Sequence, residues 1–264
     1  MRDVASRPVV FRGGGFETRP RRAAAFIAFA VLLLLWQGAT WAGLVSAVFL
    51  PSPLDITAAL WKLWVSGELW RHLSVSLLRI GAGWALGTVA GGAIGFAIGL
   101  YSLARAVGVP FVSALFPIPK IALLPLLVLW LGIGEWSKVT TIALGVFFPT
   151  VIATASGIDN VPRGLIRMAQ SFDLPMRAIL VKIVLPGALP AIISGFRISA
   201  ATALLLVVAA EMIGAQEGIG GFINTAGNLN LADQLLAGVV VLAVLGLIIG
   251  GVLSLLERRL LKWR

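Results

Sequence analysis

Cysteine is absent from this 264-residue chain, and histidine occurs once, at His72. The chain therefore has no disulfide framework and no cysteine-based metal or redox site. Charged residues are also scarce, at 12%, whereas soluble globular domains carry about 25%. Hydrophobic residues make up 59% and the mean hydropathy is +1.00, which is typical of an integral membrane protein rather than a soluble one.

Two further absences limit the available chemistry. The phosphate-binding pattern G-x-x-x-x-G-K-[ST] does not occur, so any ATP dependence must come from a separate subunit. An enzyme within the membrane would need a cluster of nucleophilic, acid-base or metal-binding side chains, which His72 alone does not provide. We expect His72 at the level of the lipid headgroups, and neither a catalytic residue nor a metal site in this chain.

Basic residues outnumber acidic ones, 21 to 11, and give a formal net charge of +10. They gather at the ends of apolar segments rather than on a soluble face, so membrane topology explains them better than nucleic-acid binding. Loops rich in Lys and Arg mark the cytoplasmic side of a membrane. The charge pattern therefore predicts that both termini and the basic loop at 162–190 are cytoplasmic.

Six apolar segments are long enough to cross a bilayer core of about 30 Å at about 1.5 Å per residue. They lie at 23–41, 74–100, 104–131, 138–155, 191–212 and 234–256. We predict an all-α integral membrane protein with a cytoplasmic N-terminal tail at 1–22 and one membrane domain at 23–264. Ser52 or Asp55 is expected to cap a short amphipathic helix before the second span, and 214–233 is expected to be an external loop.

The second span contains a regular row of glycines. They recur at every fourth position, at Gly83, Gly87, Gly91, Gly95 and Gly99. This spacing places them on one face of a helix, where the lack of side chains lets another backbone approach closely. The row therefore predicts that the second span lies at the centre of the bundle.

The third span is interrupted by Pro110, Pro117, Pro119 and Pro125. Each proline removes a backbone donor, and irregular backbone at membrane depth persists only where protein or water satisfies it. We therefore expect Pro117 and Pro119 in the wall of a translocation pathway. A purely structural membrane subunit would have no use for such a span.

Three ionisable residues, Lys120, Arg197 and Glu211, lie inside or at the margins of apolar spans. Charge is costly within a membrane, so such residues usually face a cavity or pair with one another. One interpretation is ion pairing or snorkelling. The other is that they line the pathway, with Lys120 presenting positive charge to an anion.

The loop between the fourth and fifth spans reads PRGLIRMAQSFDLPMRAILVKIVLPGALP from Pro162 to Pro190. One apolar stripe of helical period occurs in it, at Leu165, Met168, Ala169 and Phe172. Such a short amphipathic helix either lies on lipid headgroups or fits a groove on another protein.

The spacing of this loop resembles the EAA loop of ABC-importer permeases, whose pattern is Glu-Ala-Ala, three residues, Gly, nine residues, Ile, one residue, Leu-Pro. The far end of the pattern falls on Ile183, Leu185 and Pro186. The triplet falls on Arg167, Met168 and Ala169, and Asp173 stands at the glycine position. Further motifs resemble the branch of the family that imports nitrate, taurine and alkanesulfonates, namely PSP at 51–53, PIPKIALLPL at 117–126, GVFFP at 145–149 and VAAEM at 208–212.

This resemblance implies the type I ABC-importer permease fold in a bacterial inner membrane, surrounded by lipid. It also implies a homodimer of the chain, two ATPase subunits that bind ATP and magnesium, and a periplasmic solute-binding protein. The coupling loop would be at about 157–182, with ATPase contacts at Leu165, Arg167, Met168, Ala169, Phe172 and Asp173. The substrate would be a small anion such as taurine, an alkanesulfonate or nitrate. Pyrimidine or other vitamin-precursor solutes are the second choice.

A self-contained ion-coupled carrier or channel is the alternative. It would need acidic residues at the membrane midplane to carry protons or sodium. Glu211 is at the outer end of the fifth expected span, and no acidic residue lies well inside any of the six.

Overall fold

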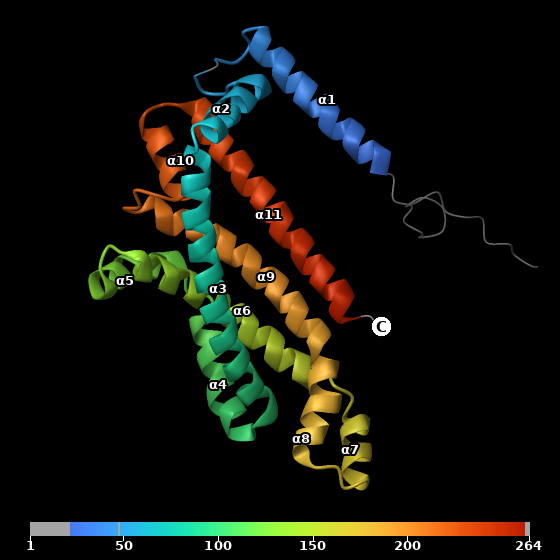
Figure 1. Ribbon diagram of the computed structural model, residues 1–264. Coiled ribbons are helices and arrows are strands. Elements are labelled where there is room, and N and C mark those ends of the chain that lie inside the picture. Colours follow the sequence, from blue (N-terminus) through green and yellow to red (C-terminus); the bar gives the residue numbers. More distant parts are fainter. Residues whose placement is uncertain (1–21, 47, 262–264) are drawn as a thin grey trace, which may run out of the picture. The chain divides into compact units, whose positions relative to one another are not determined.

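The computed structural model describes residues 22–46 and 48–261, among which no strand occurs (Figure 1). The helices are α1 (Arg22–Trp41), α2 (Pro53–Val65), α3 (Glu68–Leu100), α4 (Ser102–Leu115), η1 (Lys120–Leu123), α5 (Leu124–Leu131), α6 (Glu135–Asp159), α7 (Arg163–Ser171), α8 (Met176–Ile179), η2 (Leu180–Val184), α9 (Leu185–Met212), α10 (Ile219–Asn228) and α11 (Ala232–Leu260). The predicted all-α class is confirmed for these residues. The tail predicted at 1–22 lies outside them except for Arg22, where α1 begins.

Five helices are long and apolar enough to cross a membrane, namely α1, α3, α6, α11 and the continuous helix Met176–Met212. A sixth candidate is the bent pair formed by Ser102–Leu115 and Lys120–Leu131, whose halves meet at 87°. Each predicted span overlaps one of these candidates.

The described chain divides after Ile56 into two compact units. In the first, the backbone N–H and the hydroxyl of Ser52 donate to Asp55 Oδ2 at 3.0 and 2.7 Å, and the Asp55 N–H donates to Ser52 Oγ at 3.2 Å. These reciprocal bonds satisfy donors at the start of α2, and Pro53 in its first turn needs none. The predicted cap is confirmed.

The second unit is built on α3, α6 and α9. A Cβ at Gly87 or Gly91 would lie 2.5 or 2.6 Å from a backbone carbonyl oxygen of α6, which cannot give way. Gly92, on another face, has open space around it. The glycine row therefore packs α3 directly on α6, as its spacing predicts. Beside this contact, Ile142 of α6 and Val207 of α9 are completely buried.

The third span is sharply bent, at the place where the prolines of the interrupted apolar run at 104–131 predict irregular backbone. α4 ends at Leu115, and η1 begins only at Lys120, after a segment that contains Pro117 and Pro119. Proline lacks the N–H that would continue the ladder of α4. Pro125 lies in the first turn of α5, where a missing donor costs nothing.

The sequence predicts an external loop at 214–233, but this segment contains the helix α10. Ile219, Phe222, Ile223 and Ala226 are buried and follow a helical period. Gly220 lets α10 lie close to α9, because a Cβ there would be 2.5 Å from the carbonyl oxygen of Val208. The prediction was wrong because glycines that serve close packing resemble loop glycines in the sequence.

Candidate functional site

The basic loop folds into α7, which lies between the last residue of α6 and the start of α8 (Figure 1). Its C-terminus is closed by two backbone bonds, from Leu174 N–H to the Ala169 carbonyl at 3.2 Å and from Asp173 N–H to the Gln170 carbonyl at 3.0 Å. This arrangement requires a left-handed residue after the cap, and Asp173 has φ of 51°. Glycine adopts this conformation without strain and Asp is among the residues that tolerate it, which explains physically why Asp173 can stand at the glycine position of the EAA pattern.

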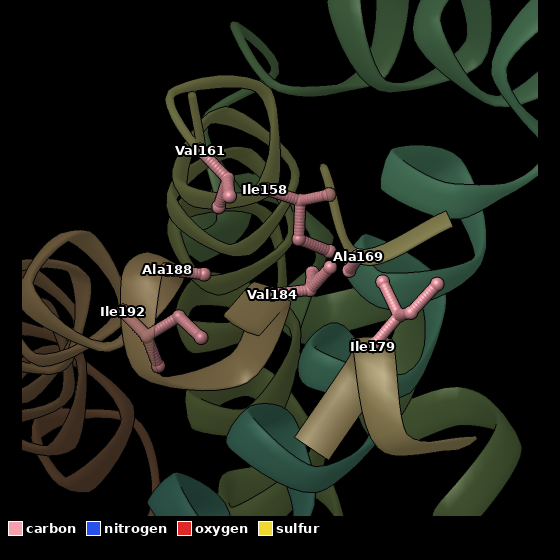
Figure 2. Packing of buried hydrophobic residues seen from close by; sticks show 7 residues of the cluster. All are labelled: Ile158, Val161, Ala169, Ile179, Val184, Ala188 and Ile192. Carbon is pink, nitrogen blue, oxygen red and sulfur yellow. The ribbon is translucent and has the colours of Figure 1, made fainter. Parts of the chain in front are cut away.

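One face of α7 is packed into the bundle. Ala169 is 2% exposed and belongs to a buried cluster with Ile158 and Val161 at the end of α6 and with Ile179, Val184, Ala188 and Ile192 on the following helices (Figure 2). Ile166, one turn earlier, packs against the same cluster. α7 is therefore packed, through this shared cluster, on the region where the end of α6 meets the helices that lead into α9.

The predicted apolar stripe is divided by this packing. Leu165, Met168 and Phe172 are 46%, 52% and 74% exposed, whereas Ala169 is interior. The sequence therefore predicted an exposed apolar surface correctly but included in it one residue that anchors the helix. The exposed three form an apolar surface on α7 and at its C-cap.

The Ile-Val-Leu-Pro end of the motif forms a local distortion in a long helix. Residues Leu180–Val184 form a π turn, followed directly by α9 with Pro186 in its first turn. Proline removes an intrahelical donor and crowds the carbonyl four residues back, which here is that of Lys182. The fifth span therefore begins at Met176 in the continuous helix rather than near 191, and the loop expected at about 157–182 includes its first turns.

Lys120 lies at the bend between α4 and η1. Its Nζ donates to the carbonyls of Leu115, Phe116 and Ile118 at 2.7, 3.2 and 2.7 Å, and lies 4.4 Å from the centroid of the Phe148 ring. These carbonyls lie at and just beyond the C-terminus of α4, where the helix supplies few donors, so the ammonium group bonds them and balances the negative helix end. Pro117 and Pro119 are exposed in the same segment. A direct contact of Lys120 with an anion stays a prediction.

A cavity of about 450 Å³ lies between α3, α4 and α6 near this bend. Its lining is mainly apolar and includes Phe116 at the end of α4. The polar part of the lining includes Ser113, Ser156 and the ion pair between Arg105 and Asp159. Phe116 connects the cavity to the Lys120 region. The centroid of its ring lies 6.5 Å from that of Phe148, the ring over which Lys120 Nζ lies.

Arg197 and Glu211 lie on α9 but do not meet. Arg197 Nη2 donates to Glu257 Oε2 at 2.7 Å and to Ser254 Oγ at 3.1 Å, both on α11. Its side chain is 52% exposed. Glu211 is instead completely buried at the other end of α9, which separates the two predicted pathway residues.

The buried partner of Glu211 is Arg79, which the sequence analysis did not single out. Arg79 Nη1 donates to Glu211 Oε1 at 2.9 Å, and its Nη2 and Nε donate to Glu135 at 2.5 and 2.6 Å. Ser76 Oγ and the Gly220 N–H also donate to Glu211, at 2.8 Å each. These bonds tie α3, α6, α9 and α10 together. A lone Arg in an apolar span is the signal that could have identified this network.

His72 belongs to the same end of the bundle and is buried there. It is 5% exposed, its Nδ1 accepts the Gly218 N–H at 3.1 Å, and its ring packs against Phe222. His72 is therefore covered by α10 rather than open to its surroundings, and its position at the level of the lipid headgroups stays a prediction. Within the described ranges, no three or more His, Asp or Glu side chains come together as metal ligands.

The comparison with known families decides the class of protein. A family model described as "Binding-protein-dependent transport system inner membrane component" matches residues 83–262. The chain belongs to this family. It is the permease subunit of an ABC importer and not an enzyme, and the family as a whole works with an ATPase and a solute-binding protein.

Two permeases of known families align with most of this chain. The "Putative aliphatic sulfonates transport permease protein SsuC" of Bacillus subtilis (strain 168) is 37% identical over 235 residues, covering 89% of this chain and 85% of the relative. The "Taurine transport system permease protein TauC" of Escherichia coli (strain K12) is 36% identical over 239 residues, covering 89% and 87%.

A solved structure supports the fold of this permease. An inward-facing form of the MetNI methionine ABC transporter superposes with a TM-score of 0.65 at 22% identity, covering 73% of this chain and 95% of that chain. Together with the family match, it confirms the predicted type I ABC-importer permease fold.

Proposed function

We propose that this permease imports a small organosulfonate, such as taurine or an aliphatic sulfonate, and that it works as a homodimer. The observation that carries the substrate class is the similarity to permeases named for aliphatic sulfonates and for taurine, at 36–37% identity over 89% of the chain. A periplasmic binding protein delivers the sulfonate, and two ATPase subunits bind ATP and magnesium on the cytoplasmic side. The excess of basic residues in the 162–190 loop and in both terminal segments of the sequence supports a cytoplasmic position for each of them.

In this proposal α7 is the coupling helix. When the ATPases close on ATP, they draw the two copies of α7 together through contacts at Leu165, Met168 and Phe172. Because Ala169 shares a buried cluster with residues at the end of α6 and the start of α9, the motion passes through this cluster to both helices. The buried Arg79 network holds their opposite ends, so the displacement at α7 tilts the spans instead of separating them.

The pathway in this proposal runs beside the bend of the third span. Pro117, Pro119 and Lys120 form its wall near the cavity between α4 and α6, and the positive charge of Lys120 favours an anionic sulfonate. Glu211 is held by Arg79, Ser76 and Gly220 rather than standing free as a proton or sodium carrier would need. This arrangement speaks against the ion-coupled alternative.

Uptake by the reconstituted complex tests the proposal. The permease, its ATPase and its binding protein are placed in proteoliposomes, and ATP-dependent accumulation of radiolabelled taurine and ethanesulfonate is measured with nitrate as competitor. We expect accumulation of a sulfonate that excess nitrate leaves unchanged. Accumulation of nitrate or of an uncharged solute, with none of either sulfonate, would exclude the proposed substrate class.

A further inference from the structure

The coupling loop carries basic side chains that have no acidic partner in the described part of the chain. They are Arg163, Arg167, Arg177 and Lys182, all exposed. None of the four makes a side-chain hydrogen bond or ion pair within residues 22–46 and 48–261. The single carboxylate between residues 160 and 184 is Asp173. The loop is therefore a surface of strongly positive charge.

Four arginines elsewhere in the second unit contrast with these four. Each of Arg71, Arg79, Arg105 and Arg197 pairs with a carboxylate, which comes from Glu217, Glu135 and Glu211, Asp159, and Glu257 respectively. These carboxylates are thus already paired within the chain. The four coupling-loop cations pair with no carboxylate among the described residues, which favours a counter-charge from another molecule.

The positive charge on α7 adjoins its exposed apolar surface. Ile166 and Ala169 face the bundle, so Arg167 and Met168 lie on the opposite, outer side of the helix. Arg163 is one turn before Arg167 on the same flank, whereas Leu165 and Phe172 lie on the other flank of Met168. A partner that covers Met168 therefore also meets the guanidinium of Arg167.

We propose that the groove of the ATPase subunit that receives α7 is apolar at its floor and acidic along one rim, where its carboxylates pair with Arg167 and Arg163. This inference rests on the proposed coupling role of α7. Like charges at such a contact cost several kcal/mol, so a basic rim would reject this helix. Because Arg167 occupies the glutamate position of the EAA pattern, the charge of this contact is inverted relative to that pattern, and the pairing with the ATPase is selective.

Association of the detergent-purified permease with its ATPase tests the proposal, because no bilayer is then available to supply anionic headgroups. Arg167→Glu should weaken the binding at least about tenfold, corresponding to about 1.4 kcal/mol. Arg167→Lys should keep most of the affinity. Arg258→Glu is the matched control, because Arg258 on α11 is also exposed and has no ion pair among the described residues. This control should leave binding unchanged.

A charge exchange completes the test. Replacing one acidic residue of the ATPase groove by Arg should restore binding to the Arg167→Glu permease and weaken binding to the wild type. Unchanged ATPase binding by the Arg167→Glu permease would overturn the acidic rim. It would also be overturned if Arg167→Glu lowered transport in vesicles containing phosphatidylglycerol but not in vesicles of pure phosphatidylcholine. Met168→Asp separates the two proposals: if it abolishes binding while Arg167→Glu does not, the coupling role stands and only the acidic rim fails.

Discussion

Arg79 Nη1 lies 2.9 Å from Glu211 Oε1 and joins α3 to α9 at the end of the bundle opposite α7. Both side chains are buried, at 5% and 0% exposure, and the guanidinium is shared with Glu135 on α6. A permease that is driven from one end needs its helices held at the other. This buried ion pair supplies that connection between apolar helices.

Removing the charge of Arg79 should destabilise the protein strongly. Arg79→Met leaves Glu211 buried without a cation, which costs about 3–5 kcal/mol in folding stability. Arg71→Met is the control, because the Arg71–Glu217 pair is 3.9 Å long and exposed, and such pairs contribute at most about 1 kcal/mol. Denaturation of the detergent-purified variants measures both. Equal stability of the two variants would show that the Arg79 network does not hold the bundle.

The glycine row can be tested by comparing adjacent residues. Gly91→Ala should destabilise the protein by about 1–3 kcal/mol, because its Cβ would lie 2.6 Å from the Phe147 carbonyl oxygen. Gly92→Ala, one residue later, meets open space and should be neutral or stabilising by up to about 1 kcal/mol, from helix propensity alone. Thermal unfolding of the two variants gives the comparison. A destabilised Gly92→Ala with an unaffected Gly91→Ala would contradict the α3–α6 packing.

Asp173 allows a test of backbone conformation apart from charge. Asp173→Gly should keep α7 folded and ATPase binding intact, because glycine adopts the left-handed conformation freely. Asp173→Val should cost about 1–3 kcal/mol locally, because a β-branched residue is strained at this φ. Proteolysis within 172–176 of the purified permease reports the local stability. A Gly variant that loses binding while its loop stays protected would instead assign the role to the carboxylate.

The fold could be predicted from the sequence where local patterns determine it. The apolar segments predicted the long helices, and the four-residue glycine spacing predicted the α3–α6 contact. Proline positions predicted a disturbed third span, but not the 87° bend, since the angle depends on what each half packs against. The helix α10 was missed because a glycine that allows close helix packing, such as Gly220, cannot be distinguished in the sequence from a glycine in a turn.

The candidate site was predicted less completely. The helical period identified the exposed residues Leu165, Met168 and Phe172, yet it gave no sign that Ala169 faces inward, because small apolar residues suit both faces. The Arg79–Glu211 pair joins residues 132 positions apart, and no local pattern records such a contact. The side-chain contacts of Lys120 and Arg197 likewise depend on which carbonyl or carboxylate groups the fold brings near them.

The charge of Lys120 can be separated from its hydrogen bonding. In the proposed pathway, Lys120→Met should lower sulfonate uptake at least about tenfold, because it removes both the cation and the donors to the α4 carbonyls. Lys120→Arg should keep substantial uptake. Lys120→Gln retains donors without charge, and we expect it to resemble Met. Full uptake by the Gln variant would show that the residue only caps α4 and does not serve the anion.

The most direct test of the central claim measures taurine uptake and ATP hydrolysis together in proteoliposomes that contain the complete importer. The account predicts that Met168→Asp lowers the number of taurine molecules taken up per ATP at least about tenfold, because a carboxylate at this 52% exposed position disrupts an apolar contact with the ATPase. Met168→Leu should retain the wild-type ratio. A Met168→Asp importer that keeps this ratio would contradict the assignment of α7 as the coupling helix.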